Sequence, residues 1–104
     1  MIYNKLVRDK IPEIIHADGK VCEFYVASDS EYRDKLYEKI VEELEEFRSN
    51  PCYEEAADIW EAFSSMCRLH NLEFAEVVKI AYLKSQQCGA FRDKLVLTSV
   101  TDHI

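Results

Sequence analysis

The chain has 104 residues, enough for one domain spanning residues 1–104, and its 48% hydrophobic share excludes a disordered protein. Two glycines and two prolines cannot supply the many tight turns of a β-sandwich or barrel, so the composition favours an all-α fold of a few long helices. The longest stretch without Asp, Glu, Lys or Arg is seven residues, which excludes a membrane span, and the formal net charge is −7.

The first elements along the chain are a short helix and a possible strand. Residues 9–17 are predicted to be helical, since Pro12 is tolerated in a first turn and Gly19 is placed to end the helix. Residues 21–27 are rich in β-forming side chains, and residues 95–100 are the only other segment that could pair with them. We therefore expect a minor two-stranded β element, 21–27 with 95–100.

Three long helices are predicted after the first strand segment. Ser28 and Glu31 form a capping box, Asn50 followed by Pro51 is a second helix start, and Asn71 can cap a third helix. The helices are expected at residues 29–48, 51–70 and 72–87, the last one ended by Gly89. The first two must form an antiparallel hairpin because their connection is short, and the three together form the helical core.

The acidic residues are concentrated in one part of the chain. The whole net charge of −7 comes from the window 38–61, where two bases, Lys39 and Arg48, face nine acids. Such a patch repels a nucleic-acid backbone and attracts cations, so we expect no nucleic-acid partner. The nine acids are Glu38, Glu42, Glu43, Glu45, Glu46, Glu54, Glu55, Asp58 and Glu61.

Helical periodicity separates four of these acids from the rest. At 100° per residue Glu43 falls on the apolar side of its helix and Glu46 on its shoulder, while Glu55 falls inside the apolar arc of the next helix with Asp58 on its shoulder. The hairpin brings Glu46 and Glu55 to similar heights, with Glu43 and Asp58 in the next layer. No Lys or Arg at helical spacing is expected to pair with Glu43 or Glu55. The remaining acids, Glu42, Glu45, Glu54 and Glu61, fit an ordinary solvated face.

Four carboxylates between two helices require a cation. At an effective dielectric constant near 20, each like-charged pair about 4 Å apart costs roughly 4 kcal/mol unless a positive charge lies between its members. Oxygen ligands suit hard divalent cations, and Mg²⁺, or Mn²⁺, keeps some of its waters for exchange with a phosphate substrate. The sequence therefore predicts a Mg²⁺ site in the hairpin.

Three stretches resemble one protein family. Glu42-Glu43-Leu44-Glu45-Glu46 followed by Glu54-Glu55-Ala56-Ala57-Asp58 resembles the Glu-Glu-x-x-Glu and Glu-x-x-Asp signature of the MazG-like all-α nucleoside triphosphate pyrophosphohydrolases. The opening Tyr3-Asn4-Lys5-Leu6-Val7-Arg8-Asp9-Lys10-Ile11-Pro12 looks like the start of the small house-cleaning branch of that family. Gly89-Ala90-Phe91 resembles its C-terminal Arg-Gly-Gly-Phe motif, except that Cys88 stands where the family has arginine.

The resemblance implies an activity and a ligand set. It implies Mg²⁺ held by Glu43, Glu46, Glu55 and Asp58, and hydrolysis of a nucleoside triphosphate to monophosphate and pyrophosphate. Glu42 and Glu46 are the two candidates for the carboxylate that orients or deprotonates the attacking water. It also implies a homodimer or homotetramer, whose subunits combine into a four-helix-bundle-like core.

Basic and apolar residues outside the acidic window suggest how substrate and partner would bind. The candidate substrate-binding cations are Lys84 and Arg92, which flank Phe91, together with Lys5 and Arg8 near the N-terminus. The last long helix is apolar on two faces, which independently indicates a homodimer at least. Met1–Arg8 lacks the apolar core of a signal peptide and no Cys-x-x-Cys pair occurs, so a cytoplasmic location with free thiols is expected.

Two other functions compete with this interpretation. A di-iron carboxylate bundle needs two Glu-x-x-His motifs on long facing helices, whereas the sequence has one, from Glu13 to His16, in a short segment. A non-catalytic metal- or partner-binding helical module with a degenerate active site is the alternative that Cys88 keeps open. Release of pyrophosphate in the presence of Mg²⁺ discriminates between this module and an enzyme.

Overall fold

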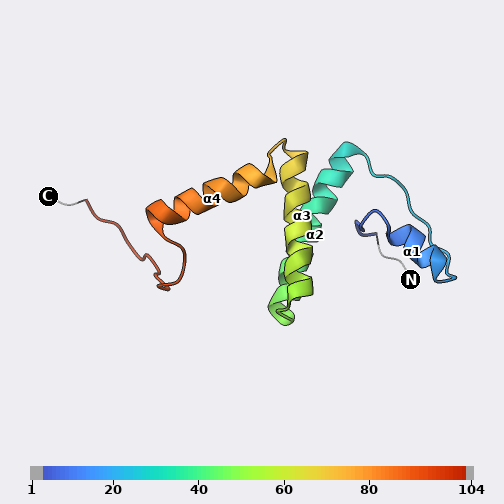
Figure 1. The fold of residues 1–104 in the computed structure, drawn as a ribbon, viewed down its shortest axis with the longest axis horizontal. Helices are drawn as coiled ribbons and strands as arrows, with labels where there is room; N and C mark the ends of the chain where they lie inside the picture. The colour runs from blue at the N-terminus through green and yellow to red at the C-terminus, as the bar shows by residue number, and fades with distance from the viewer. Residues whose placement is uncertain (1–3, 103–104) are drawn as a thin grey trace. The chain divides into compact units, whose positions relative to one another are not determined.

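The computed structural model describes residues 4–102, and this part of the chain contains four helices and no strand (Figure 1). The helices are α1 (Ile11–Ala17), α2 (Asp29–Ser49), α3 (Tyr53–Leu69) and α4 (Phe74–Cys88). The predicted all-α class is confirmed. The chain divides into two compact units, residues 1–72 and 73–104, each of which is described by itself below.

Local signals explain how α1 and α2 are bounded. Gly19 has a φ of +77°, which glycine adopts without strain, and its N–H donates to the carbonyl of His16 at 3.0 Å. The predicted end of α1 at this glycine is confirmed. Ser28 is the N-cap of α2, and its hydroxyl accepts the N–H of Glu31 at 3.2 Å, as the capping-box pattern predicts.

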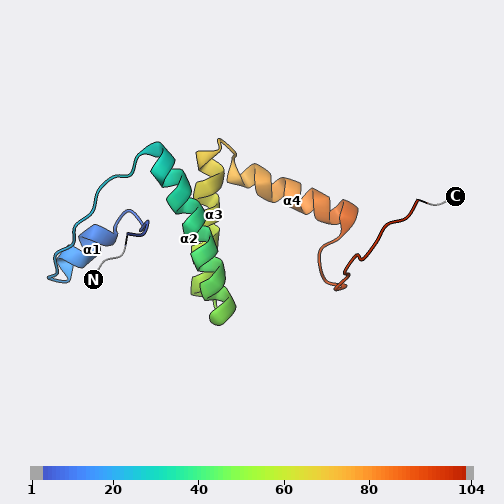
Figure 2. The ribbon, with the colours of Figure 1, turned by 180° about the vertical axis from the view of Figure 1, so that it is seen from behind.

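Helices α2 and α3 form the predicted antiparallel hairpin, and they lie side by side in both views (Figure 1, Figure 2). The buried apolar side chains of the described residues all come from these two helices: Leu36, Ala62, Met66 and Cys67. Tyr37, Leu44 and Phe47, which share the expected apolar arc of α2, remain exposed because one neighbouring helix covers only part of that arc. The hairpin core is therefore small and lies along the seam between α2 and α3.

Two predicted helix starts are wrong. The N-cap of α3 is Cys52, whereas Asn50 ends α2 and donates its backbone N–H to the carbonyl of Glu46 at 2.9 Å. Asn71 does not cap α4; it has a φ of +58° and follows α3, where the N–H of Leu72 donates to the carbonyl of Cys67 at 2.8 Å. Asparagine favours both helix starts and the left-handed conformation that ends helices, so its presence alone does not decide between them.

The predicted two-stranded element is not found. Residues 21–27 and 95–100 contain no strand, and their apolar side chains are open to solvent, with Val21 93% and Leu95 88% exposed. An isolated pair of strands is marginal in water without a surface to cover, so high β-propensity by itself did not produce a ladder here.

The second unit contains α4 and the residues that follow it. Gly89 has a φ of +84° and donates its N–H to the carbonyl of Ser85 at 2.9 Å, which ends the helix where the sequence predicted. Val78, Ile80 and Leu83 of α4 are all exposed in this single chain. Within residues 4–102, no helix combines the length and the apolar character that a membrane crossing requires.

Candidate metal centre

The hairpin brings three acidic side chains together. Glu43 of α2 and Glu55 and Asp58 of α3 each contribute one carboxylate oxygen to a group in which all oxygens lie within 4.8 Å of one another. Glu55 and Asp58 are three residues apart and therefore lie on the same face of α3, opposite Glu43. These are three of the four ligands that the sequence predicted.

Glu43 is the most unusual member of this cluster. It is 4% exposed and is the one buried charged residue among the described residues. Its Oε1 lies 3.3 Å from Nζ of Lys39, but its Oε2 is buried and has no hydrogen-bond partner in the described part of the chain. Glu55 Oε2 is in the same situation. Buried carboxylate oxygens are almost always partnered, so two unpartnered ones in residues of the same cluster set this group apart from the other acids of the hairpin.

The carboxylates of this group also affect one another's ionisation. Burial raises the pKa of Glu43, an effect opposed by Lys39 and reinforced by the negative charges of Asp58 and Glu46. Burial also raises the pKa of Glu55, and the neighbouring carboxylates, Glu46 first, raise it further. Both acids therefore resist ionisation without a ligand, and a bound dication would favour their charged forms.

The donor set and its spacing fit a small hard cation. Mg²⁺ prefers oxygen ligands in an octahedron at about 2.0–2.1 Å, so the ligand oxygens around one ion lie about 2.8–4.2 Å apart. Oxygens within 4.8 Å of each other need only small side-chain adjustments to reach that geometry. Glu43, Glu55 and Asp58 could therefore hold Mg²⁺ or Mn²⁺, with water completing the shell.

The fourth predicted ligand, Glu46, lies beside this group. It is exposed and does not belong to the three-oxygen set, yet its charge acts on both Glu43 and Glu55. Glu46 lines an open pocket near the hairpin turn. The residues around this pocket are Glu42, Glu45, Glu46, Ser49, Asn50 and Glu55.

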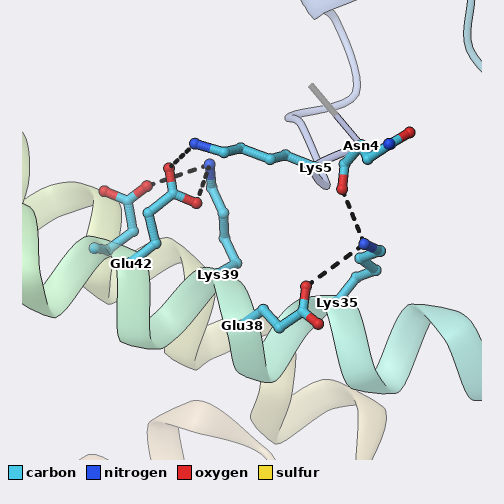
Figure 3. Close-up of polar contacts among 7 residues, drawn as sticks. Asn4, Lys5, Lys35, Glu38, Lys39 and Glu42 are labelled. Atoms are coloured by element: carbon cyan, nitrogen blue, oxygen red, sulfur yellow. Dashed lines mark hydrogen bonds and ion pairs between the residues drawn. The ribbon is translucent and has the colours of Figure 1, made fainter. Parts of the chain in front are cut away.

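Two lysines neutralise acids on α2: Lys39 at Glu43 and Glu42, and Lys5 at Glu42. Nζ of Lys39 lies 3.3 Å from Glu43 and 3.8 Å from Glu42, and Nζ of Lys5 donates to Glu42 at 3.2 Å (Figure 3). The expectation that no lysine at helical spacing pairs with Glu43 is therefore wrong. Lys39 precedes Glu43 by four residues, a spacing that places both on one helix face and could have revealed the pair. Glu42 is half-buried rather than fully solvated.

Lys5 and Arg8, the N-terminal cations predicted to bind substrate, each contact an acidic side chain of the hairpin. Lys5 reaches Glu42, and Nη2 of Arg8 donates to Oδ1 of Asp58 at 2.7 Å. Nothing in the sequence pattern indicated these two pairings. Lys84 and Arg92 belong to the second unit and stay predicted substrate ligands. The acids predicted to be solvated, Glu45, Glu54 and Glu61, are exposed.

Comparisons of the chain with protein-family models, with curated proteins and with solved structures found no match. The resemblance of the motifs to the MazG-like family therefore stays a prediction. The carboxylate cluster and its surrounding cations are the observations from which a function can be inferred.

Proposed function

We propose that the chain is a Mg²⁺-dependent nucleoside triphosphate pyrophosphohydrolase of the MazG-like type. It would hydrolyse ribo- or deoxyribonucleoside triphosphates, including non-canonical ones, to monophosphate and pyrophosphate, and so clean the nucleotide pool of the cytoplasm. One observation carries the proposal: oxygens of Glu43, Glu55 and Asp58 lie within 4.8 Å of one another, and the first two residues each have a buried, unpartnered oxygen.

The four acids would have distinct roles. Glu43, Glu55 and Asp58 would hold the dication, and Glu46, whose charge acts on Glu43 and Glu55, would be the fourth ligand. A bound Mg²⁺ supplies charge neutralisation at the phosphate oxygens, and Mn²⁺ can do the same. The buried position of Glu43 fixes one ligand rigidly, whereas the half-buried Asp58 and the exposed Glu46 leave a side open to substrate.

We propose Glu46 rather than Glu42 as the residue that orients the attacking water. Oε2 of Glu42 lies 3.8 Å from Nζ of Lys39, which belongs to the same helix, so it is less able to accept a hydrogen bond from water. Glu46 is exposed and lines the same pocket as Glu55. We therefore assign to Glu46 the role of orienting the attacking water.

We also propose that the active form is a homodimer or homotetramer that completes a four-helix-bundle-like core. Large apolar side chains are exposed within each unit of the single chain: Val41, Leu44 and Trp60 in the first, Val78, Ile80 and Leu83 in the second. A second copy is the partner that would cover such surfaces in a chain with a small core. Sedimentation equilibrium should therefore give a mass at least twice that of the chain.

The test of the activity is a panel of normal and damaged nucleoside triphosphates with metal omitted and then restored. We expect pyrophosphate release from at least one of them only when Mg²⁺ or Mn²⁺ is present. Glu43→Gln should abolish the release, and Glu61→Gln, which changes an exposed acid of α3, should not. Absence of turnover for the whole panel in a folded, metal-binding protein would contradict the proposed reaction and favour a non-catalytic metal-binding module.

A further inference from the structure

The N-terminal basic segment, defined here as residues 4–8, lies against the α2–α3 hairpin through three separate contacts, one of which reaches the acidic cluster. The carbonyl oxygen of Asn4 accepts a hydrogen bond from Nζ of Lys35 at 2.9 Å. Lys5 contacts Glu42 at 3.2 Å, and Arg8 contacts Asp58 at 2.7 Å. Figure 3 shows Lys5 extending over α2 toward the carboxylate that Lys39 also reaches. The segment is thus tied to both helices of the hairpin.

The contact between Arg8 and Asp58 conflicts with metal binding. Asp58 belongs to the group of three carboxylates that could hold a dication, so its charge cannot serve Arg8 and a metal ion equally well. A dication beside Asp58 also repels the guanidinium directly. Arg8 is 57% exposed, so its side chain can leave Asp58 without opening the core. The cation released in this way remains on the N-terminal basic segment, which Asn4 and Lys5 hold against α2.

An arginine in that position suits a phosphate group. Its guanidinium forms planar, paired hydrogen bonds with phosphate oxygens, and it keeps its charge at any physiological pH. A triphosphate carries more negative charge than one dication neutralises, so the protein must supply further cations at the site. Lys5, 53% exposed and held by a single carboxylate oxygen, is a second cation of the same kind.

We propose that Arg8 changes partner when metal binds: it neutralises Asp58 in the metal-free protein and binds a phosphate oxygen of the ligand in the metal-bound protein, with Lys5 moving likewise from Glu42. The inference rests on the proposed metal site and deepens it, because it names residues 4–8 as the phosphate-binding element and makes anion binding depend on prior metal binding. Arg8 therefore competes with the metal and cooperates with the phosphate.

This pair of opposite effects gives a sharp test. Mn²⁺ affinity would be measured by electron paramagnetic resonance, and affinity for imidodiphosphate, a non-hydrolysable diphosphate, by calorimetry at saturating Mn²⁺. Arg8→Gln should raise Mn²⁺ affinity severalfold, since it removes the competitor for Asp58. The same substitution should lower imidodiphosphate affinity about tenfold or more, the value of a charge-assisted hydrogen bond to phosphate. Lys5→Gln should act in the same two directions, more weakly.

Matched variants separate this exchange from a structural role. Lys20→Gln removes an exposed lysine of the same unit that pairs with Asp18, and both affinities should stay at the wild-type level. Arg8→Lys keeps the charge but loses the planar fork, so Mn²⁺ affinity should be nearly unchanged while imidodiphosphate affinity falls.

Each other outcome has a definite meaning. If Arg8→Gln lowers both affinities together, or leaves either of them unchanged, the exchange of partners is overturned while the metal site stands. If the wild-type chain binds no Mn²⁺, the proposed function itself fails, so the two failures are distinguishable.

Discussion

Glu43→Gln should stabilise the metal-free protein and remove its response to metal. The substitution keeps the shape of a side chain that is 4% exposed but eliminates its charge. At an effective dielectric constant near 20, attraction to Lys39 at 3.3 Å favours the charge by about 5 kcal/mol and repulsion from Asp58 within 4.8 Å opposes it by about 3.5 kcal/mol or more. These two interactions largely cancel, and Glu55 adds further repulsion.

The burial of the Glu43 carboxylate then decides whether the substitution raises or lowers the free energy of unfolding. A buried polar atom without a partner costs about 1–3 kcal/mol, and Glu43 Oε2 is such an atom, whereas the amide nitrogen of glutamine can donate a hydrogen bond to the neighbouring carboxylate of Glu55 or Asp58. Lys39 keeps Glu42 as a partner in the variant, so no second charge is left alone. We expect a net gain of roughly 1 kcal/mol, which corresponds to a rise in Tm of about 4 °C or more for a domain of this size.

The assay is thermal unfolding followed by circular dichroism, with and without Mg²⁺, for the wild type, Glu43→Gln and the exposed control Glu61→Gln. The control should unfold like the wild type in both conditions. A loss of about 3–5 kcal/mol in metal-free Glu43→Gln, the usual cost of breaking a buried ion pair, would refute this reasoning. Glu43 would then be a structural partner of Lys39 and not a metal ligand.

Three further predictions concern metal, pH and helix capping. Mg²⁺ at 100 times its dissociation constant should stabilise the wild type by about 2.7 kcal/mol, and an unchanged Tm would count against the site. The folded-state pKa values of Glu43 and Glu55 are raised above their ordinary 4.5, so the folded protein binds protons more readily than the unfolded chain. The free energy of unfolding of the metal-free protein should therefore rise as the pH falls from neutrality through these pKa values. A decrease in this free energy over the same pH range would contradict the assignment. Ser28→Ala should cost about 1 kcal/mol in urea unfolding, because Glu31 N–H loses its acceptor, and an unchanged midpoint would show that the cap is unimportant.

Local patterns in the sequence were sufficient for the helices and for part of the site. The capping box at Ser28 and the glycine after α1 act within a few residues, so their structural outcome depends little on the rest of the fold. The position of Glu43 on the buried side of α2 follows from helical periodicity alone, and the short connection to α3 brings Glu55 and Asp58 opposite it. These features need no knowledge of distant contacts.

The features that the sequence did not reveal depend on distant parts of the chain. Lys5 and Glu42 are 37 residues apart and Arg8 and Asp58 are 50 apart, and no periodicity links such positions. The segments 21–27 and 95–100 form no strands for a related reason. A strand needs a pairing strand and a surface to cover, and β-propensity specifies neither. The pairing of Lys39 with Glu43 is different. These residues are four apart in one helix, so the pair could have been predicted from the sequence.

The most direct measurement for the central claim is a crystal of the protein soaked in Mn²⁺ and measured at a wavelength where manganese scatters anomalously. We expect one anomalous peak between the carboxylates of Glu43, Glu55 and Asp58, at bonding distance from an oxygen of each. Ordered carboxylates at these three residues without such a peak, in a crystal saturated with Mn²⁺, would contradict the claim that the hairpin holds a dication.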